Sequence, residues 1–227
     1  IGDTTIGEGT RVFPHAVLGG EPQNTAHGGA RTRLVIGSRN TIREGVTMHI
    51  GTDNARGETT VGDHCMFLAY SHVAHDCILG NHVTFANNVM IGGHTEIGDR
   101  VIVGGGAGVH QFCRIGHHAF IGGLAAVQAD VIPFGMIMGN RGYLAGLNLV
   151  GMKRSGMEKG EINALRHAFK LLFEQNTGSL RDNAGEALVA YPGSKVVRDV
   201  TDFILSDTKR KFMTPLSSSN TRRENGD

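Results

Sequence analysis

The chain has 227 residues, of which 40% are hydrophobic and 19% charged, and its formal net charge is +1. This length supports one large domain, or one domain with an appendage. The balanced charge argues against a dedicated nucleic-acid-binding protein. The sequence has no apolar run of about 18 residues, so it predicts no transmembrane segment.

Three cysteines are an odd number and too few for a disulfide framework, which favours a reducing compartment. No basic and apolar leader opens the sequence, so we expect a cytoplasmic protein. The sequence starts at Ile1, inside a repeat. We therefore expect the N-terminal coils of the natural protein to be missing from this chain.

A six-residue repeat dominates the first half of the chain. Every sixth residue is bulky and apolar at Val61, Phe67, Val73, Leu79, Phe85, Ile91, Ile97, Val103, Val109, Ile115, Ile121 and Val127. The residue four places further on is small or β-branched, and the residue after the bulky one is often Gly. Residues 6–18 and 36–48 keep the same period, and irregular segments at about 19–34 and 51–60 interrupt it.

A period of six fits neither the 3.6 residues of a helical turn nor the alternation of a strand. It predicts a solenoid of short strands, in which three hexads form one 18-residue coil of triangular section. The bulky residues fill the interior, and Gly, which lacks a Cβ atom, suits the corners. Turns in a sandwich or a propeller recur at longer and less regular intervals. We therefore predict a parallel β-helix over residues 1–140.

The three cysteines have a simple explanation in this scheme. Cys65, Cys77 and Cys113 all fall in the small interior column of the repeat. The repeat therefore predicts buried, inert thiols rather than a nucleophile or a zinc site built from cysteines.

The hexad pattern stops near Pro133, and a region with helical periodicity follows. Ser155 and Glu158 have the spacing of a capping box, and the apolar residues behind them recur at helical intervals. Helices are predicted near residues 155–172, 180–190 and 195–206. We expect an α-helical domain over residues 141–214 and a flexible tail over residues 215–227.

Histidines are concentrated in the β-helical part, and eleven of the twelve lie before residue 119. Residues 18 apart lie one above another, at about 4.8 Å per coil. This spacing stacks His75, Gly93 and Gln111 in one column and Asp76, His94 and Phe112 in the next, with His72 and His110 beside them. Histidines, one carboxylate and one Gly backbone thus gather within three coils.

The His75–Asp76 pair suits general-base chemistry. A neutral histidine can accept a proton near neutral pH, and a carboxylate can fix its tautomer and stabilise the imidazolium that forms. Adjacent strand residues point to opposite faces, so contact between the two side chains requires a corner. Gly93, one coil above, offers a backbone N–H to a developing oxyanion. No Ser or Cys nucleophile falls in this column, which favours direct transfer over a covalent enzyme intermediate.

Three other interpretations of these histidines stay open at this point. Outward-facing histidines on a solenoid can be plain solvated surface, as we expect for His64, His82, His117 and His118. A zinc site of the kind found in trimeric β-helix carbonic anhydrases could form from His72, His75 and either His94 or His110. The chain could also be a solenoid scaffold without catalytic activity.

Four separated stretches resemble one known family. They are Ser71–Cys77, Asn87–His94, Val109–Cys113 and Gly146–Arg154. Their order and spacing are similar to those of the acyl-[acyl-carrier-protein]–UDP-N-acetylglucosamine O-acyltransferases, which catalyse the first step of lipid A biosynthesis. The likeness runs from about Leu18 to the helices near residue 175. Hexapeptide repeats alone are less specific, because other acyltransferases and γ-carbonic anhydrases share them.

The resemblance implies a left-handed parallel β-helix with a C-terminal helical domain, assembled as a homotrimer with active sites between subunits. It implies transfer of a (3-hydroxy)acyl chain from acyl carrier protein to the 3-hydroxyl of UDP-N-acetylglucosamine, with no cofactor and no metal. By motif match, His75 is the general base, Asp76 orients it, and the Gly93 N–H stabilises the oxyanion.

The same match implies further binding residues. Those for the sugar nucleotide or the thioester arm are His72, His94, His110 and Gln111. Asn148 and Arg154 are expected to contact the nucleotide phosphates or the acyl carrier. Gly123 and Phe120 are expected in the groove that holds the acyl chain.

One loop departs from the pattern of the family. Family members often carry an Asp-Leu-Lys stretch there, whereas residues 22–33 of this chain contain neither Asp nor Lys. Asn24 and His27 are the candidates to substitute. Further on, the basic residues between Arg141 and Lys170 suit docking of an acidic acyl carrier, although the same charges could simply solvate a helix face.

Overall fold

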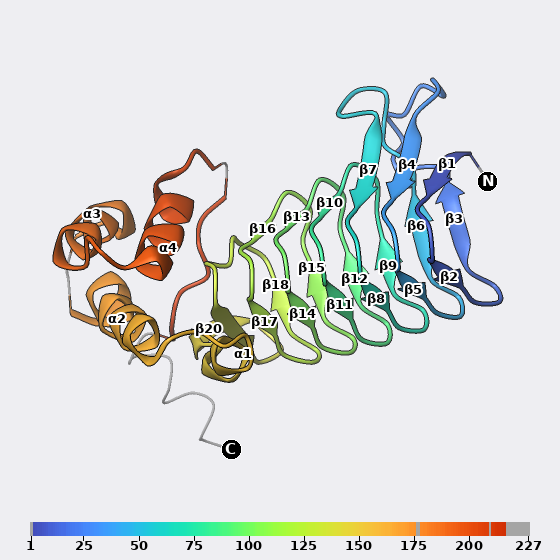
Figure 1. The fold of residues 1–227 in the computed structure, drawn as a ribbon. Coiled ribbons are helices and arrows are strands. Elements are labelled where there is room, and N and C mark those ends of the chain that lie inside the picture. The colour runs from blue at the N-terminus through green and yellow to red at the C-terminus, as the bar shows by residue number, and fades with distance from the viewer. Residues whose placement is uncertain (1, 176–177, 209, 217–227) are drawn as a thin grey trace, which may run out of the picture.

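The computed structural model describes residues 2–175, 178–208 and 210–216. These residues form a long prism of stacked coils, with a group of helices at its C-terminal end (Figure 1). Of the predicted tail, residues 217–227 lie outside the described residues. No helix in the described ranges combines the length and the apolar character needed to cross a bilayer.

Three sheets form the walls of the prism. The first contains β1 (Asp3–Ile6), β4 (Arg33–Ile36), β7 (Glu58–Val61), β10 (Ile78–Leu79), β13 (Glu96–Ile97) and β16 (Arg114–Ile115). The second contains β2 (Arg11–Val12), β5 (Thr41–Ile42), β8 (Met66–Phe67), β11 (Thr84–Phe85), β14 (Ile102–Val103), β17 (Phe120–Ile121), β19 (Gly135–Met138) and β20 (Tyr143–Leu147). The third contains β3 (Val17–Gly20), β6 (Thr47–His49), β9 (His72–Val73), β12 (Met90–Ile91), β15 (Gly108–Val109) and β18 (Ala126–Val127).

The strand register confirms the predicted 18-residue coil. Ile78 of β10 pairs with Glu96 of β13, and all strand pairs except the final hairpin β19–β20 run parallel. The first coils are longer, because Val17 pairs with Thr47 across the irregular segment near residues 19–34. Three parallel sheets of repeating short strands match the predicted left-handed β-helix.

The bulky hexad residues form one continuous core along the prism. Phe67, Phe85 and Ile121 are fully buried, and the two phenylalanine rings meet edge to face, with their centroids 5.2 Å apart. Burying an apolar side chain of this size stabilises the fold by about 1.5–3 kcal/mol. The core exists only between neighbouring coils, so the coils stabilise one another rather than folding singly.

The cysteines lie in the core, as the repeat predicts. Cys65, Cys77 and Cys113 are buried free thiols. Burial raises the pKa of Cys77 to about 12 and that of Cys65 and Cys113 to about 11. These thiols therefore stay protonated near neutral pH and are poor nucleophiles.

The repeated glycines do not serve the corners in the way that the repeat predicts. The left-handed backbone at the corners occurs two residues later, at non-glycine positions such as His64 and His82. Gly62 is needed for a different reason, because a Cβ atom there would lie 2.6 Å from the carbonyl oxygen of Gly80 in the next coil. The hexad glycine thus permits the close approach of stacked backbones rather than an unusual φ angle.

The C-terminal region contains the predicted helices. They are α1 (Leu149–Arg154), α2 (Lys159–Lys170), the π-helix η1 (Leu171–Gln175), α3 (Leu180–Ala190) and α4 (Lys195–Leu205). The hairpin of β19 and β20 spans residue 140, the predicted boundary between the two regions. The capping box at Ser155 and Glu158 is wrong: Ser155 ends α1, its hydroxyl donates to Met152 O, and Glu158 makes no capping hydrogen bond.

Candidate active site

His75 and Asp76 lie at a corner of the prism, between β9 and β10. Asp76 adopts a left-handed backbone with φ of 60°, which turns the two neighbouring side chains toward one another. His75 Nδ1 lies 2.8 Å from Asp76 Oδ2. His75 is 7% exposed and Asp76 2% exposed. The corner therefore provides the contact that the sequence alone left open.

The irregular segment at residues 51–60 holds Asp76 in place. The backbone N–H and the hydroxyl of Thr52 both donate to the Asp76 carboxylate, with the hydroxyl at 2.7 Å, and Asp76 N–H donates to Thr59 Oγ1. Burial acts to raise the pKa of Asp76, but hydrogen bonds from Thr52 and His75 outweigh it and keep the pKa below its ordinary value. Asp76 is therefore an ionised acceptor for His75 Nδ1–H.

Gly93 lies one coil above His75, as the strand register between β9 and β12 requires. A Cβ atom on Gly93 would lie 2.7 Å from Cε1 of His75, so the imidazole packs directly against the Gly93 backbone. The neighbouring N–H groups of Gly92 and His94 donate to carbonyl oxygens. Within the described part of the chain, the Gly93 N–H has no such acceptor, which leaves it available to a ligand.

His94 packs behind His75 on the same corner. Its ring meets that of His75 edge to face at 5.0 Å and stacks on Phe112 at 4.3 Å between centroids. Its Nε2 lies 4.0 Å from Asp76 Oδ2. Burial lowers the pKa of His94, the charge of Asp76 opposes this effect, and His75 adds to it. His94 thus supports the pair as a neutral ring near neutral pH.

A cavity of about 510 Å³ opens beside His75 on the third sheet. Of the residues predicted for the site, His72, Gly93, His110 and Gln111 also line it. His72 Nδ1 lies 2.7 Å from Thr47 Oγ1. Burial, reinforced by the neighbouring His49 and His75, lowers the pKa of His72 to about 4.

The divergent loop at residues 22–33 contributes a residue that sequence reasoning missed. Gln23 lines the cavity, whereas Asn24 accepts a hydrogen bond from the N–H of Ala26. His27 lies 3.2 Å from Asp53. Gln23 and Thr52 share one sequence signal: both lie in segments where the hexad period breaks.

The other predicted residues lie elsewhere in the chain. Phe120, Asn148 and Arg154 line a second cavity of about 440 Å³ against the second sheet. Asn148 caps α1, because its Oδ1 accepts from Gly151 N–H while its Nδ2 donates to His118 O. Gly123 lines neither of these two cavities, and a Cβ atom there would lie 3.3 Å from Gly105 O.

The arrangement also bears on the alternative zinc site. His75, Asp76 and His94 lie close enough to share a metal ion, with their ligand atoms within 4.8 Å of one another. This set has a carboxylate in place of the third histidine of the predicted site. The Asp76 carboxylate also accepts hydrogen bonds from Thr52 and His75, so a cation bound there would share the carboxylate with these donors.

Comparison with known proteins gives matches to both parts of the chain. The family described as UDP-N-acetylglucosamine O-acyltransferase, domain 2, matches residues 130–213, and the bacterial transferase hexapeptide family matches residues 58–93. The acyl-[acyl-carrier-protein]–UDP-N-acetylglucosamine O-acyltransferase of Bartonella henselae is 54% identical over 227 residues, which are 100% of this chain and 82% of that protein. The protein of the same name from Brucella ovis is 60% identical over 214 residues, covering 94% and 77% of the two chains.

A solved structure gives the same result in three dimensions. The UDP-N-acetylglucosamine acyltransferase from Campylobacter jejuni is 41% identical, with a TM-score of 0.88, and the match covers 95% of this chain and 82% of that one. The likeness includes the coils and the helical region together. The chain therefore belongs to the acyl-[acyl-carrier-protein]–UDP-N-acetylglucosamine O-acyltransferase family.

Proposed function

We propose that this chain transfers an acyl group from a thioester on acyl carrier protein to the 3-hydroxyl of UDP-N-acetylglucosamine, the first step of lipid A biosynthesis. The observation that carries the proposal is the buried His75–Asp76 pair with the open Gly93 N–H one coil above it. Acyl transfer needs a base for the nucleophile and a donor for the oxyanion, and this corner supplies both. We place the reaction in the bacterial cytoplasm.

The chemistry follows from the tautomer of His75. Nδ1–H donates to the ionised Asp76, so Nε2 accepts the proton of the sugar 3-hydroxyl while that oxygen attacks the thioester carbonyl carbon. The Gly93 N–H stabilises the charge on the carbonyl oxygen. When the intermediate collapses, the C–S bond breaks and the leaving thiolate takes the proton from Nε2 of the imidazolium. Asp76 stabilises this imidazolium through its charge.

The remaining site residues divide between the two cavities. His72, His110 and Gln111 line the cavity beside His75, where they suit the sugar nucleotide and the thioester arm. His94 does not line this cavity but packs against the His75 ring. In the second cavity, Arg154 offers its cation to the nucleotide phosphates or to the acidic carrier.

We infer that a homotrimer joins the two cavities. Met90 on the third sheet is 56% exposed and Ile102 on the second sheet is 42% exposed. Apolar side chains exposed on two walls of the prism support self-association. In this arrangement the second cavity of one subunit faces the His75 corner of its neighbour, and Asn148 and Arg154 belong to the neighbour's site.

We assign the acyl chain to the apolar side of the second cavity. Ile102, Phe120 and Met136 line it, which gives a hydrophobic surface suited to a fatty acyl chain. Gly123, at the corner after β17, stays part of this proposed groove, although it does not line the cavity of the single chain. A (3-hydroxy)acyl chain is the donor that we expect.

Mass spectrometry of the products tests the proposal. The purified chain is incubated with UDP-N-acetylglucosamine and a ladder of acyl-carrier thioesters, each with and without a 3-hydroxyl group. We expect one acyl group to be added to the sugar, and no product when the acceptor lacks its 3-hydroxyl. A folded chain that acylates no acceptor with any donor would overturn the proposal.

Two further measurements separate the rival functions. A zinc enzyme would contain stoichiometric zinc, and its removal would stop all activity, which elemental analysis and chelation detect. A scaffold would show no saturable binding of UDP-N-acetylglucosamine in calorimetry. We expect saturable binding and acyl transfer that persists after chelation.

A further inference from the structure

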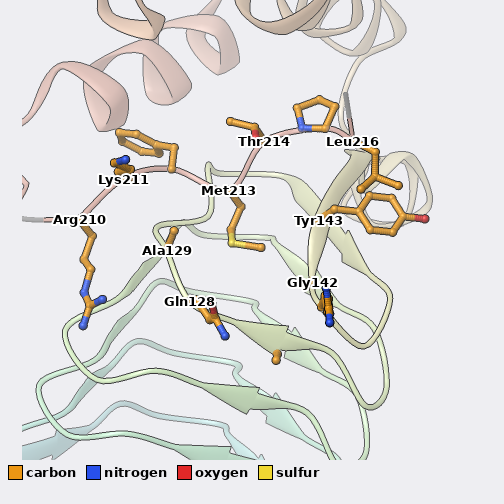
Figure 2. Close-up of a pocket in the computed structure, with 13 residues that line it drawn as sticks. Gln128, Ala129, Gly142, Tyr143, Arg210, Lys211, Met213, Thr214 and Leu216 are labelled. Atoms are coloured by element: carbon orange, nitrogen blue, oxygen red, sulfur yellow. The ribbon is translucent and has the colours of Figure 1, made fainter. Parts of the chain in front are cut away.

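The C-terminal segment after α4 returns to the β-helix and places Arg210 against His110 and Gln111, two coils above His75. Arg210 lines a cavity of about 660 Å³ at the end of the prism and extends toward the coils (Figure 2). This cavity shares Ala126 and Gln128 with the one that contains His75. Arg210 thus lies in a cavity that adjoins the one with His75, although the two residues are 135 positions apart in the sequence.

A buried carboxylate anchors this segment. Asp130 is fully buried, accepts hydrogen bonds from the backbone N–H and the Nε of Arg114, and accepts another from the Thr208 hydroxyl. Its backbone pairs with both sides of Phe212, through Lys211 O and Met213 N–H. The backbone N–H of Arg210 donates to Thr208 Oγ1. The position of Arg210 is therefore fixed by contacts with the last coil.

One nitrogen of the Arg210 guanidinium contacts two acceptors on the neighbouring coil. Nη2 lies 2.9 Å from His110 Nδ1 and 2.8 Å from the carbonyl oxygen of Gln111. His110 Nδ1 and this oxygen are themselves only 3.2 Å apart. Both are thus within reach of the two N–H groups of Nη2.

The contact with Arg210 favours one of the two neutral tautomers of His110. A guanidinium can only donate, so its hydrogen bond to His110 Nδ1 forms only when that nitrogen carries no hydrogen. The neutral ring then carries its proton on Nε2. Without Arg210, the ring has the opposite preference, because Nδ1–H can donate to the Gln111 carbonyl oxygen at 3.2 Å.

We propose that Arg210 is a positioning residue that holds His110 in the Nε2–H tautomer. His110 is exposed and lines the cavity beside His75, so it presents a hydrogen-bond donor to the bound substrate. The sugar, its N-acetyl group and the diphosphate of a sugar nucleotide are rich in acceptors, which suits a donor at this place. The effect on turnover rests on the proposed function, whereas the tautomer is a property of the unliganded protein.

Nitrogen NMR of the uniformly ¹⁵N-histidine-labelled protein tests the tautomer directly. At a pH where the ring is neutral, we expect Nε2–H for His110 in the wild-type protein and Nδ1–H in Arg210→Met. The His110→Gln variant assigns the signal, and Lys211→Met is the matched control on the same segment. Arg210→Ala is a second variant, so the tautomer can still be measured if Arg210→Met folds poorly. An unchanged tautomer in a folded Arg210 variant would overturn the proposal.

A double-mutant cycle tests whether the effect passes through His110. We expect Arg210→Met to raise the KM for UDP-N-acetylglucosamine about threefold to tenfold, as the loss of one hydrogen bond to the substrate requires, with a smaller change in kcat. In a His110→Ala background the same substitution should add no further loss. A full effect of Arg210→Met in that background would show direct substrate contact and reject the positioning role. Absence of wild-type turnover would contradict the proposed function, while the NMR result would still decide this inference.

Discussion

Histidines at two corners of the prism differ sharply in their surroundings. At one corner, His64 and His82 stack on each other with their ring centroids 5.0 Å apart, and both are exposed. At the other, His75 is buried and bonded to the buried Asp76. The hexad repeat builds both corners with the same left-handed turn, so the repeat itself does not distinguish them.

The difference comes from an insertion. The segment at residues 51–60 folds over the second corner and directs two donors of Thr52 at Asp76. Burying a carboxylate is costly unless hydrogen bonds compensate, so these donors allow Asp76 to stay ionised inside. The comparison shows that the regular repeat places side chains at a corner but does not make them reactive. The irregular segment at residues 51–60 supplies the hydrogen bonds that keep Asp76 ionised beside His75.

Removal of His75 tests this difference most strongly. We expect His75→Ala to lower kcat by a factor on the order of 10²–10⁴, because the general base is lost. His82→Ala, at the other corner, should keep wild-type turnover. Steady-state kinetics with UDP-N-acetylglucosamine and an acyl-carrier thioester measure both, and circular dichroism checks that both fold. Near-normal turnover of His75→Ala would show that His75 is not the general base.

Gly93→Ala is expected to have the next largest effect. The new Cβ atom would lie 2.7 Å from the His75 ring, so the imidazole must move, and a displacement of this kind costs on the order of 10²-fold in rate. Gly105→Ala is the matched control at an equivalent corner position, where the nearest atom to a Cβ would be 3.4 Å away. Equal activities of the two variants would contradict the tight packing of His75 on Gly93.

Thr52→Val tests the insertion itself. The loss of the hydroxyl that donates to Asp76 should raise the pKa of that carboxyl and lower kcat/KM by about tenfold, with Thr60→Val as the control. Carboxyl NMR titration reads the pKa, and kinetics read the rate. If both quantities match those of the wild type, the insertion has no part in preparing the base.

The pH dependence of stability tests folding rather than turnover. His72 has a pKa of about 4 in the folded chain against an ordinary value of 6.5, because it is buried near His49 and His75. The unfolded chain therefore binds more protons between these values, so the free energy of unfolding falls as the pH drops from about 6.5 to about 4. Denaturant titrations at several pH values should show a weaker fall for His72→Asn than for His82→Asn. If the free energy of unfolding falls equally with pH in the two variants, the burial of His72 does not cause this pH dependence.

The sequence predicted the positions of some site residues and gave no information on others. The 18-residue period by itself places Gly93 above His75, and the strand register confirms this placement. The same arithmetic carries no information on Thr52, Gln23 or Arg210, because they lie in irregular segments that have no period. The capping box at Ser155 failed for a related reason: short local patterns do not show that the residue already closes the preceding helix.

The sequence by itself determined the coil and its core, because a strict period leaves the interior side chains only one register in which they are buried. It indicated the family through four separated motifs, not through the period. Only the tertiary structure decided how Asp76 stays ionised and which nitrogen of His110 bears its proton. Those properties depend on donors from Thr52 and Arg210, which are brought in by folding across 24 and 100 residues of chain. Hydrogen bonds of this kind act over about 3 Å, a distance that the order of residues does not encode.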